Sequence, residues 1–182
     1  MLQIRIHGRG GQGVVTAAEL IAIAAFINGK QSQAFPSFGV ERTGAPVESY
    51  VRIDNKPIKT HEQIYQPDIL IIQDSTLLNN PSLTNGINSK TKIIINTAKK
   101  KTDLKLKLPQ SNIYTIDATK IAMEILGKNI VNTVILGALI KFTDIISINS
   151  LIIAIKEKFA DKNKELINKN IKAVEKAYQN NF

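Results

Sequence analysis

A run of glycines between two apolar segments constrains the fold of this chain more than any other feature. The run reads Gly8-Arg9-Gly10-Gly11-Gln12-Gly13. The apolar residues 2–6 precede it, and residues 12–27, with apolar side chains at helical spacing, follow it. Glycine permits a positive φ and lets another group approach the backbone closely. The pattern predicts a strand, a tight turn and a helix whose first amide groups can receive an anion.

The rest of the chain alternates between strand-like and helical patterns. Strands are predicted at 47–53, 69–73, 92–96 and 112–116, with a hairpin turn at 54–57. Helices are predicted at 118–126, 132–143, 148–159 and 163–179. This order favours one Rossmann-like domain over residues 1–182. We expect a three-layer α/β/α fold with a mostly parallel sheet and a helical C-terminal part.

Several local predictions accompany this outline. Residues 30–46 and 99–108 are expected to be irregular, and the strand 47–53 half-exposed. Thr60-His61-Glu62-Gln63 has the pattern of a capping box for one short helical turn. Asp74 and Asp117 follow strands and are expected to cap helices. The buried stripe of the last helix is expected at Ile167, Ile171, Val174 and Tyr178.

Composition narrows the function classes. The chain has no cysteine, which excludes disulfides, cysteine nucleophiles and cysteine-ligated iron–sulfur clusters within it. Its net charge of +9 comes almost entirely from lysine, and aromatic residues make up only 5%. Scarce arginine and aromatics argue against a nucleic-acid binder. No apolar run approaches the roughly 18 residues of a membrane span, and no secretory pattern opens the chain. We therefore expect a cytoplasmic protein with neither a nucleic acid nor a membrane as partner.

The glycine run has more than one possible meaning. Gly8, Gly10 and Gly13 satisfy the G-x-G-x-x-G pattern of dinucleotide-binding folds. The acidic residue that should follow about 20 positions later to hold a ribose is absent. Three interpretations remain open: a cradle for the phosphates of another ligand, a structural turn, and a turn at a subunit interface. Candidate contacts are Gly8, Arg9, Gly10, Gly11, Gln12, Gly13 and Arg42.

The segment 34–46 is the second unusual stretch. It is poor in regular-structure formers, and ordering such a segment is costly unless it packs against something. Phe35 and Phe38 are aromatic anchors suited to an interface. Glu41 can pair with Arg42, or Arg42 can bind a phosphate or a partner's carboxylate. We predict an interface at Phe35, Phe38, Glu41 and Arg42, with an ordinary surface loop as the alternative.

These stretches together resemble one protein family. The chain carries Gly8-x-Gly-Gly-Gln-Gly13, then Gln33-Ala-Phe-Pro-Ser-Phe-Gly-Val-Glu-Arg-Thr-Gly-Ala-Pro-Val47, Tyr50-Val-Arg-Ile-Asp54, His61 with Gln66-Pro67-Asp68, Asn132-Thr133, Leu136-Gly137-Ala138-Leu139 and Asn170. In this order they are similar to the gamma subunits of 2-oxoacid:acceptor oxidoreductases, in the pyruvate:ferredoxin branch. The resemblance covers about residues 3–178. Val40 and Thr43 depart from it, because many relatives have proline and a second basic residue there.

The resemblance implies a role in a multi-subunit complex. Such complexes oxidatively decarboxylate pyruvate to acetyl-CoA and pass electrons to ferredoxin or flavodoxin. The resemblance places thiamine diphosphate, magnesium and iron–sulfur clusters on partner subunits of the alpha, beta and delta types, and the gamma subunit beside the entry of coenzyme A. A related complex for 2-oxoglutarate or a branched-chain 2-oxoacid remains an alternative, as does a stand-alone nucleotide-binding module.

The chain itself offers no obvious catalytic machinery. It has no evident pair of base and nucleophile, and no Gly-Asp-Gly…Asn segment of the kind that holds the metal and the diphosphate of thiamine diphosphate. His7 and His61 are expected to be structural imidazoles. We therefore predict no catalytic residue, no metal ligand and no cofactor held by this chain alone.

Overall fold

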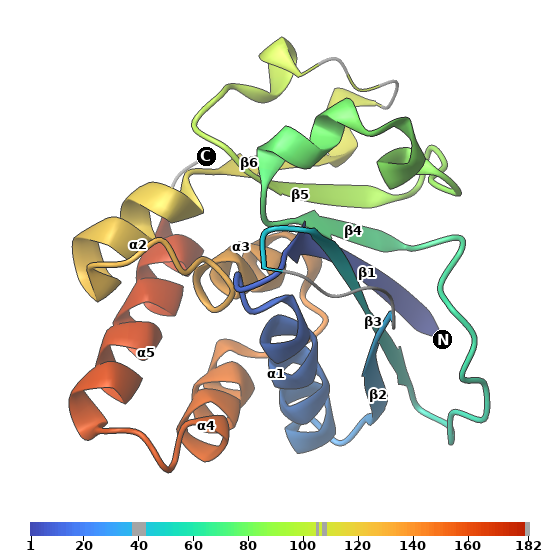
Figure 1. Cartoon of the computed structure of the whole chain (residues 1–182). Helices are drawn as coiled ribbons and strands as arrows, with labels where there is room; N and C mark the ends of the chain where they lie inside the picture. The colour runs from blue at the N-terminus through green and yellow to red at the C-terminus, as the bar shows by residue number, and fades with distance from the viewer. Residues whose placement is uncertain (38–42, 105, 107–108, 181–182) are drawn as a thin grey trace.

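Figure 1 shows the computed structural model, which describes residues 1–37, 43–104, 106 and 109–180. The described residues form a six-stranded sheet in the order β2-β3-β1-β4-β5-β6. The strands are β1 (Leu2–Arg9), β2 (Gln31–Pro36), β3 (Pro46–Asp54), β4 (Ile69–Ile72), β5 (Lys92–Asn96) and β6 (Ile113–Ile116). β1, β4, β5 and β6 run parallel, whereas β2 and β3 add antiparallel at one edge. The expected α/β class with a mostly parallel sheet is confirmed.

One face of the sheet is covered by helices (Figure 1). They are α1 (Val14–Ile27), α2 (Ala118–Leu126), α3 (Val134–Thr143), α4 (Ile148–Lys158) and α5 (Lys164–Gln179). Ile4 and Ile6 of β1 are fully buried here, in the same core as the alanine-rich α1 and the apolar α3. Gly137 lets α3 and α5 approach closely, because a Cβ at this position would lie 2.3 Å from the carbonyl oxygen of Val174. The predicted helical C-terminal part is therefore confirmed.

The other face is covered by short 3₁₀ helices and irregular chain instead of α-helices (Figure 1). The 3₁₀ helices η1 (Ser75–Asn79) and η2 (Pro81–Thr84) follow β4. Their Leu77 and Leu83 pack in a second apolar cluster with side chains of β4, β5 and β6. This layer carries no apolar helical stripe, so the sequence does not predict its 3₁₀ helices, apart from the cap expected at Asp74.

Next to that cluster, the same face is polar and held by an arginine. Arg5 is only 6% exposed, and its guanidinium donates to the carbonyl oxygens of Ile64, Tyr65, Leu83 and Asn85 at 2.8–3.4 Å. These carbonyls belong to two segments far from β1 in sequence: the irregular chain before β4, and the 3₁₀ helix η2 with its C-cap Asn85. Arg5 therefore fastens both segments to the sheet.

Two predictions about the first third of the chain are wrong. The segment 30–46 is not irregular throughout, because it contains β2, whose residues pair antiparallel with β3 from Gln31↔Asp54 to Pro36↔Ser49. The hairpin therefore lies before β3, not at 54–57. After the turn at 54–57 the chain runs without helix or strand to β4, which pairs parallel with β1. β2 lacks a clear apolar alternation, and only its pairing with β3 defines it as a strand.

The strand β3 is also less exposed than predicted. Its Tyr50 and Arg52 are each 2% exposed, because the chain between β3 and β4 covers them. Arg52 donates to the carbonyl oxygen of Glu62 in this covering segment. The predicted helical turn at 60–63 is not formed; instead His61 Nδ1 lies 2.6 Å from Gln33 Nε2 on β2.

The elements after β3 agree more closely with the predictions made from the sequence. Asp74 caps η1 and Asp117 caps α2, as predicted. In α5, Val174 is fully buried but Tyr178 is 38% exposed, so the predicted stripe is shifted. Small or polar residues occupy the contact with α3, namely Asn170, Ala173 and Ala177. None of the helices in the described ranges has the length and apolar character needed to span a bilayer.

Candidate functional site

The glycine loop links the end of β1 to the start of α1 and combines two kinds of glycine. Gly8 and Gly13 are packing positions, since a Cβ would lie 2.5 Å from Val14 Cγ2 and 2.3 Å from Asn132 Nδ2 respectively. Gly11 has a φ of +91° and open space where a Cβ would stand. Gly13 is the N-cap of α1, in the left-handed region, and as a glycine it has no side chain that could cap the helix. The first amide groups of α1 are therefore free of a side-chain acceptor from their cap.

Arg9 does not extend freely from the loop. Its Nε donates to Asp74 Oδ2 at 3.0 Å, and its two terminal nitrogens donate to the carbonyl of Gly44 at 3.1 Å and to Thr76 Oγ1 at 2.7 Å. Gln12 closes the ring: its Oε1 accepts from Arg9 N at 2.8 Å, and its Nε2 donates to Asp74 at 3.1 Å. Burial opposes ionisation of Asp74, but hydrogen bonds from Thr76 and Gln12 and the charge of Arg9 outweigh it and lower the pKa of the carboxyl.

The loop is also joined to the segment that precedes β3. Gly10 N donates to Ala45 O at 2.9 Å, and Gly44 N donates to Gly10 O at 3.1 Å. Between them lies a hollow of about 470 Å³. It is lined by Arg9, Gly10, Gly11, Gly13, Val14, Val15, Thr43 and Val47. The structure thus brings the glycine loop and the described end of the segment 34–46 to one site.

A second hollow, of about 310 Å³, lies on the β4 side of the loop. Its lining is polar and includes Gln12, Gln73, Asp74 and Asn96. Gln73 is 1% exposed, and within the described ranges neither atom of its side-chain amide has a hydrogen-bond partner. Gln73 could not be predicted as a site residue, because a single glutamine at a strand end carries no distinguishing sequence pattern.

The predicted interface residues are only partly described. Phe35 lies on β2, half-buried, with its ring centroid 5.2 Å from that of Tyr50 and with the Arg52 guanidinium 5.2 Å from its ring centre. It therefore packs against its own sheet. Phe38, Glu41 and Arg42 lie outside the described residues.

The two histidines, His7 and His61, interact with side chains of the neighbouring strands β3 and β2. His7 is 4% exposed, and burial lowers its pKa to about 4, against the opposing charge of Glu48, whose Oε1 lies 3.5 Å from Nδ1. His61 is exposed and pairs with Gln33. Among the residues that the structure describes, no three histidine or carboxylate side chains gather where they could hold a metal ion.

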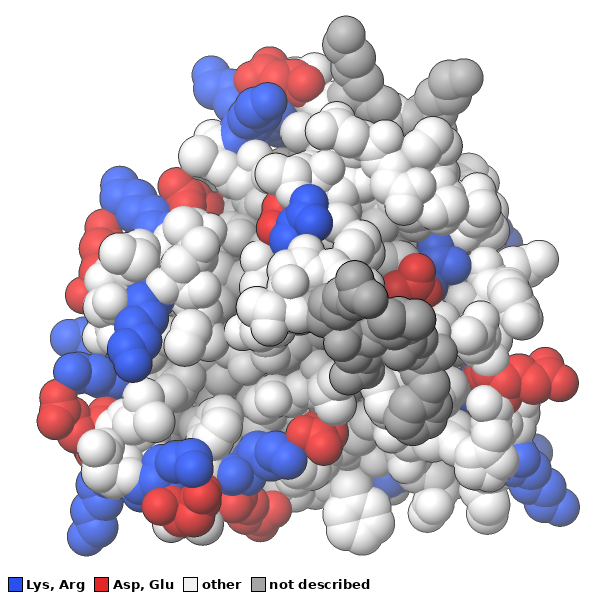
Figure 2. Space-filling view, in the orientation of Figure 1, with Lys and Arg blue, Asp and Glu red and all other residues white. Residues whose placement is uncertain are grey.

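Charged side chains gather over the C-terminal helices on the face shown in Figure 2. Lysine, arginine and carboxylate side chains lie toward its left and lower margins, over α2, α4 and α5, and others lie at its top and right. At the glycine loop itself, Arg9 and Asp74 form an ion pair, with their side chains 34% and 17% exposed.

This combination of glycine loop and fold is found in a known protein family. The sequence model of the pyruvate ferredoxin/flavodoxin oxidoreductases matches residues 3–180. The chain belongs to this family. It is 49% identical over 181 residues to the pyruvate/ketoisovalerate oxidoreductases common subunit gamma of Pyrococcus furiosus, covering 98% of this chain and 96% of the relative. It is 51% identical over 178 residues to pyruvate synthase subunit PorC of Methanocaldococcus jannaschii, with 98% and 96% covered.

A solved member of the family has the same fold. The crystal structure of pyruvate oxidoreductase subunit PORC from Thermotoga maritima superposes with a TM-score of 0.84 at 33% identity. The match covers 98% of this chain and 95% of that one. The resemblance predicted from the sequence motifs is confirmed.

Proposed function

We propose that this chain is the gamma subunit of a complex that oxidatively decarboxylates pyruvate to acetyl-CoA and passes electrons to ferredoxin or flavodoxin. The observation that carries the proposal is its near full-length similarity to subunits of that name. Alpha, beta and delta-type partners would hold thiamine diphosphate, magnesium and the iron–sulfur clusters. The absence of cysteine from the sequence supports this division, because such clusters are held by cysteine thiolates.

Within that complex, we propose that the glycine loop receives the phosphates of coenzyme A. The amide groups at the start of α1 and the positive end of its dipole face the hollow beside Gly11, which suits an anion. Arg9 contributes in a way the sequence did not predict. Because Asp74 and Thr76 already hold its guanidinium, Arg9 orients the loop and supplies a partly neutralised charge.

The hydrogen bonds between the glycine loop and the segment before β3 support a second part of the proposal, docking of the partner subunits, because they bring two candidate contact segments to one site. Phosphate binding and docking can coexist, since the loop would then close a coenzyme A channel between chains. We retain Gly8, Arg9, Gly10, Gly11, Gln12, Gly13 and Arg42 as the proposed contacts with coenzyme A or with a partner. Phe35, Phe38, Glu41 and Arg42 remain proposed interface residues.

The test compares valine substitutions at two glycines that both have a positive φ. Gly11 and Gly29 have φ of +91° and +76°, and a Cβ at either would meet nothing within 4 Å. Gly11→Val and Gly29→Val therefore introduce similar backbone strain, about 1–3 kcal/mol each. Only Gly11→Val places a side chain in the hollow beside α1. In the assembled complex it should raise the KM for coenzyme A about tenfold, equivalent to about 1.4 kcal/mol.

The KM for pyruvate should stay unchanged in both variants, because pyruvate would bind at the thiamine centre on another chain. Size-exclusion chromatography separates the two parts of the proposal. A Gly11→Val chain that no longer assembles indicates docking through the loop, whereas normal assembly with equal coenzyme A kinetics in both variants contradicts phosphate binding there.

One relative's name favours a broader substrate range. The Pyrococcus furiosus protein is named as common to pyruvate and ketoisovalerate oxidoreductases. We propose as the second candidate that this chain also serves a branched-chain 2-oxoacid complex. Co-purification with two different sets of partner subunits would support this candidate, and a single set would contradict it.

A further inference from the structure

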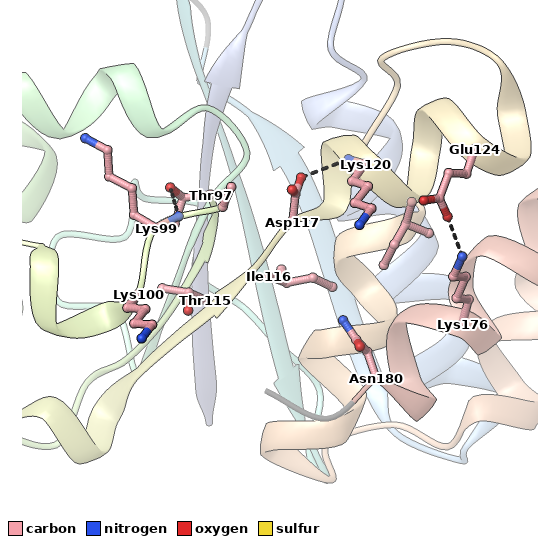
Figure 3. Close-up of a pocket in the computed structure, with 12 residues that line it drawn as sticks. Thr97, Lys99, Lys100, Thr115, Ile116, Asp117, Lys120, Glu124, Lys176 and Asn180 are labelled. Atoms are coloured by element: carbon pink, nitrogen blue, oxygen red, sulfur yellow. Dashed lines mark hydrogen bonds and ion pairs between the residues drawn. The ribbon is translucent and has the colours of Figure 1, made fainter.

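A basic hollow lies away from the glycine loop, at the carboxyl ends of β5 and β6. It has a volume of about 420 Å³ and brings together the chain after β5, the end of β6, helix α2 and the end of α5 (Figure 3). Its lining residues are Thr97, Ala98, Lys99, Lys100, Thr115, Ile116, Asp117, Lys120, Ile121, Glu124, Lys176 and Asn180. Four lysines from three separate segments thus border one concavity.

The two carboxylates of the hollow are already engaged. Asp117 Oδ1 accepts from the backbone N–H of Lys120 at 2.9 Å and so caps α2. Glu124 is ion-paired with Lys176, and the hydrogen bond and charge of this lysine lower the pKa of the Glu124 carboxyl. Lys176 compensates Glu124, whereas Asp117 keeps its negative charge, so Lys99, Lys100 and Lys120 leave the hollow with a net positive charge.

The other three lysines have no ion-pair partner among the described residues. Lys99, Lys100 and Lys120 are all exposed. Figure 3 shows the Lys120 side chain over the hollow and Lys100 on the opposite rim beside Thr115, while Lys99 points away. These lysines are solvated, and no described carboxylate forms an ion pair with them. The cluster therefore gives this rim a net positive charge that can bind an acidic partner.

The floor of the hollow differs from its rim. Ile116 and Ile121, 2% and 4% exposed, form the base of the hollow, and the exposed Ala98 borders it beside Lys99. A concave apolar floor inside a cationic rim suits a chain segment with acidic side chains on either side of an apolar one. A free phosphate fits less well. The cap of α2 is occupied by Asp117, and Lys100 and Lys120 stand on opposite rims instead of converging on one point.

We propose that this hollow docks an acidic segment of a neighbouring subunit in the same complex, with carboxylates paired to Lys100 and Lys120 and an apolar side chain over Ile116. The proposal rests on the proposed function, because it needs a partner subunit. It adds a contact surface separate from the glycine loop. The apolar floor favours a lasting subunit contact over a transient electron acceptor, for which charge alone would suffice.

The first test is zero-length cross-linking of the assembled complex with a carbodiimide, which joins a lysine amine to a carboxylate in contact with it. We expect peptides in which Lys100 or Lys120 is joined to an aspartate or glutamate of a partner subunit. Lys56 and Lys90 serve as controls. Both are exposed and lie at the opposite end of the sheet, where no such product is expected.

The second test reverses charge. The double variant Lys100→Glu/Lys120→Glu should weaken assembly at physiological salt at least tenfold, and the effect should shrink at 1 M salt as charges are screened. Lys56→Glu/Lys90→Glu makes the same change in net charge and should leave assembly unaffected. All four side chains are exposed, so none of these substitutions should prevent folding.

The outcomes separate this inference from the function on which it rests. If the complex assembles but Lys100 and Lys120 form no cross-link to a partner and tolerate charge reversal, the docking surface is wrong and the proposed function stands. If the unmodified chain joins no partner subunit, the proposed function fails. Cross-links only to an added ferredoxin, or a variant that assembles but loses only the binding of small anions such as pyrophosphate, would also overturn the proposal.

Discussion

Both faces of the sheet have an apolar cluster, but around β1 they are closed in different ways. On the helical face, β1 contributes Ile4 and Ile6, which are fully buried among the apolar side chains of the helices. On the opposite face the same strand contributes Arg5 and His7, which are also buried. Here the chain before β4 and the 3₁₀ helix η2 are held by hydrogen bonds from the Arg5 side chain to their carbonyl groups. Consecutive residues of β1 therefore pack in the apolar core on one face and donate hydrogen bonds to distant carbonyl groups on the other.

Burial alone therefore does not determine which residue type a position requires. The helical face tolerates changes that preserve volume, because its contacts are numerous and non-directional. The polar face depends on a few directed bonds whose loss leaves buried carbonyls unpaired. Its stability should therefore be concentrated in few residues.

The largest effect is expected from Arg5→Met, compared with Ile6→Met in the next position of β1. Arg5→Met removes the donor to four carbonyl groups and should lower the free energy of unfolding by about 3 kcal/mol or more. Ile6→Met nearly conserves volume in the apolar core and should cost less than about 1.5 kcal/mol. Denaturant unfolding of both variants measures the difference.

Equal losses for the two variants would contradict a concentration of stability in Arg5. A larger loss for Ile6→Met would show that the helical face is the less tolerant of the two.

The same contrast explains how far the sequence could predict the fold. The helices α2, α3, α4 and α5 were predicted within about two residues at each end, because apolar periodicity and caps such as Asp117 are local signals. The strand β2 and the covering segment after β3 were not. Their conformations depend on pairing with β3 and on bonds from Arg5 and Arg52, which connect residues more remote in sequence.

The candidate site shows the same division. The four glycines located the loop, because positive φ and close packing are requirements written into residue type. The hydrogen bond from Arg9 to Asp74, 65 positions away, could not be predicted from either residue alone. The lysine-rich run after β5 was visible in the sequence, but its hollow arises only when α2 and α5 come beside it.

An intermediate effect is expected from pH, through His7. Burial lowers the pKa of this imidazole from 6.5 to about 4, so the unfolded chain binds its proton more readily than the folded chain. Stability from His7 is therefore complete above pH 6.5 and is lost as pH falls from 6.5 toward 4, by about 3 kcal/mol at most. Between pH 7 and 4, the wild type should lose more stability than His7→Gln by up to this amount.

His61→Gln is the matched control, because it removes an exposed imidazole from the segment that covers the same face. Parallel pH profiles for the wild type and His7→Gln would show that the proton enters His7 without opening the polar face.

The smallest effect is expected from Tyr65→Ala, and it tests how the polar face holds its cover. Tyr65 is 69% exposed, and its contribution comes from its carbonyl group, which accepts from Arg5 at 3.4 Å. The substitution keeps that carbonyl, so the free energy of unfolding should change by about 0.5 kcal/mol or less. Phe26→Ala, at the end of α1 and also 69% exposed, is the equivalent change on the helical face and should have an equally small effect. A loss above about 1.5 kcal/mol for Tyr65→Ala alone would mean that the covering segment is held by side-chain packing, and the contrast between the two faces would then be one of degree.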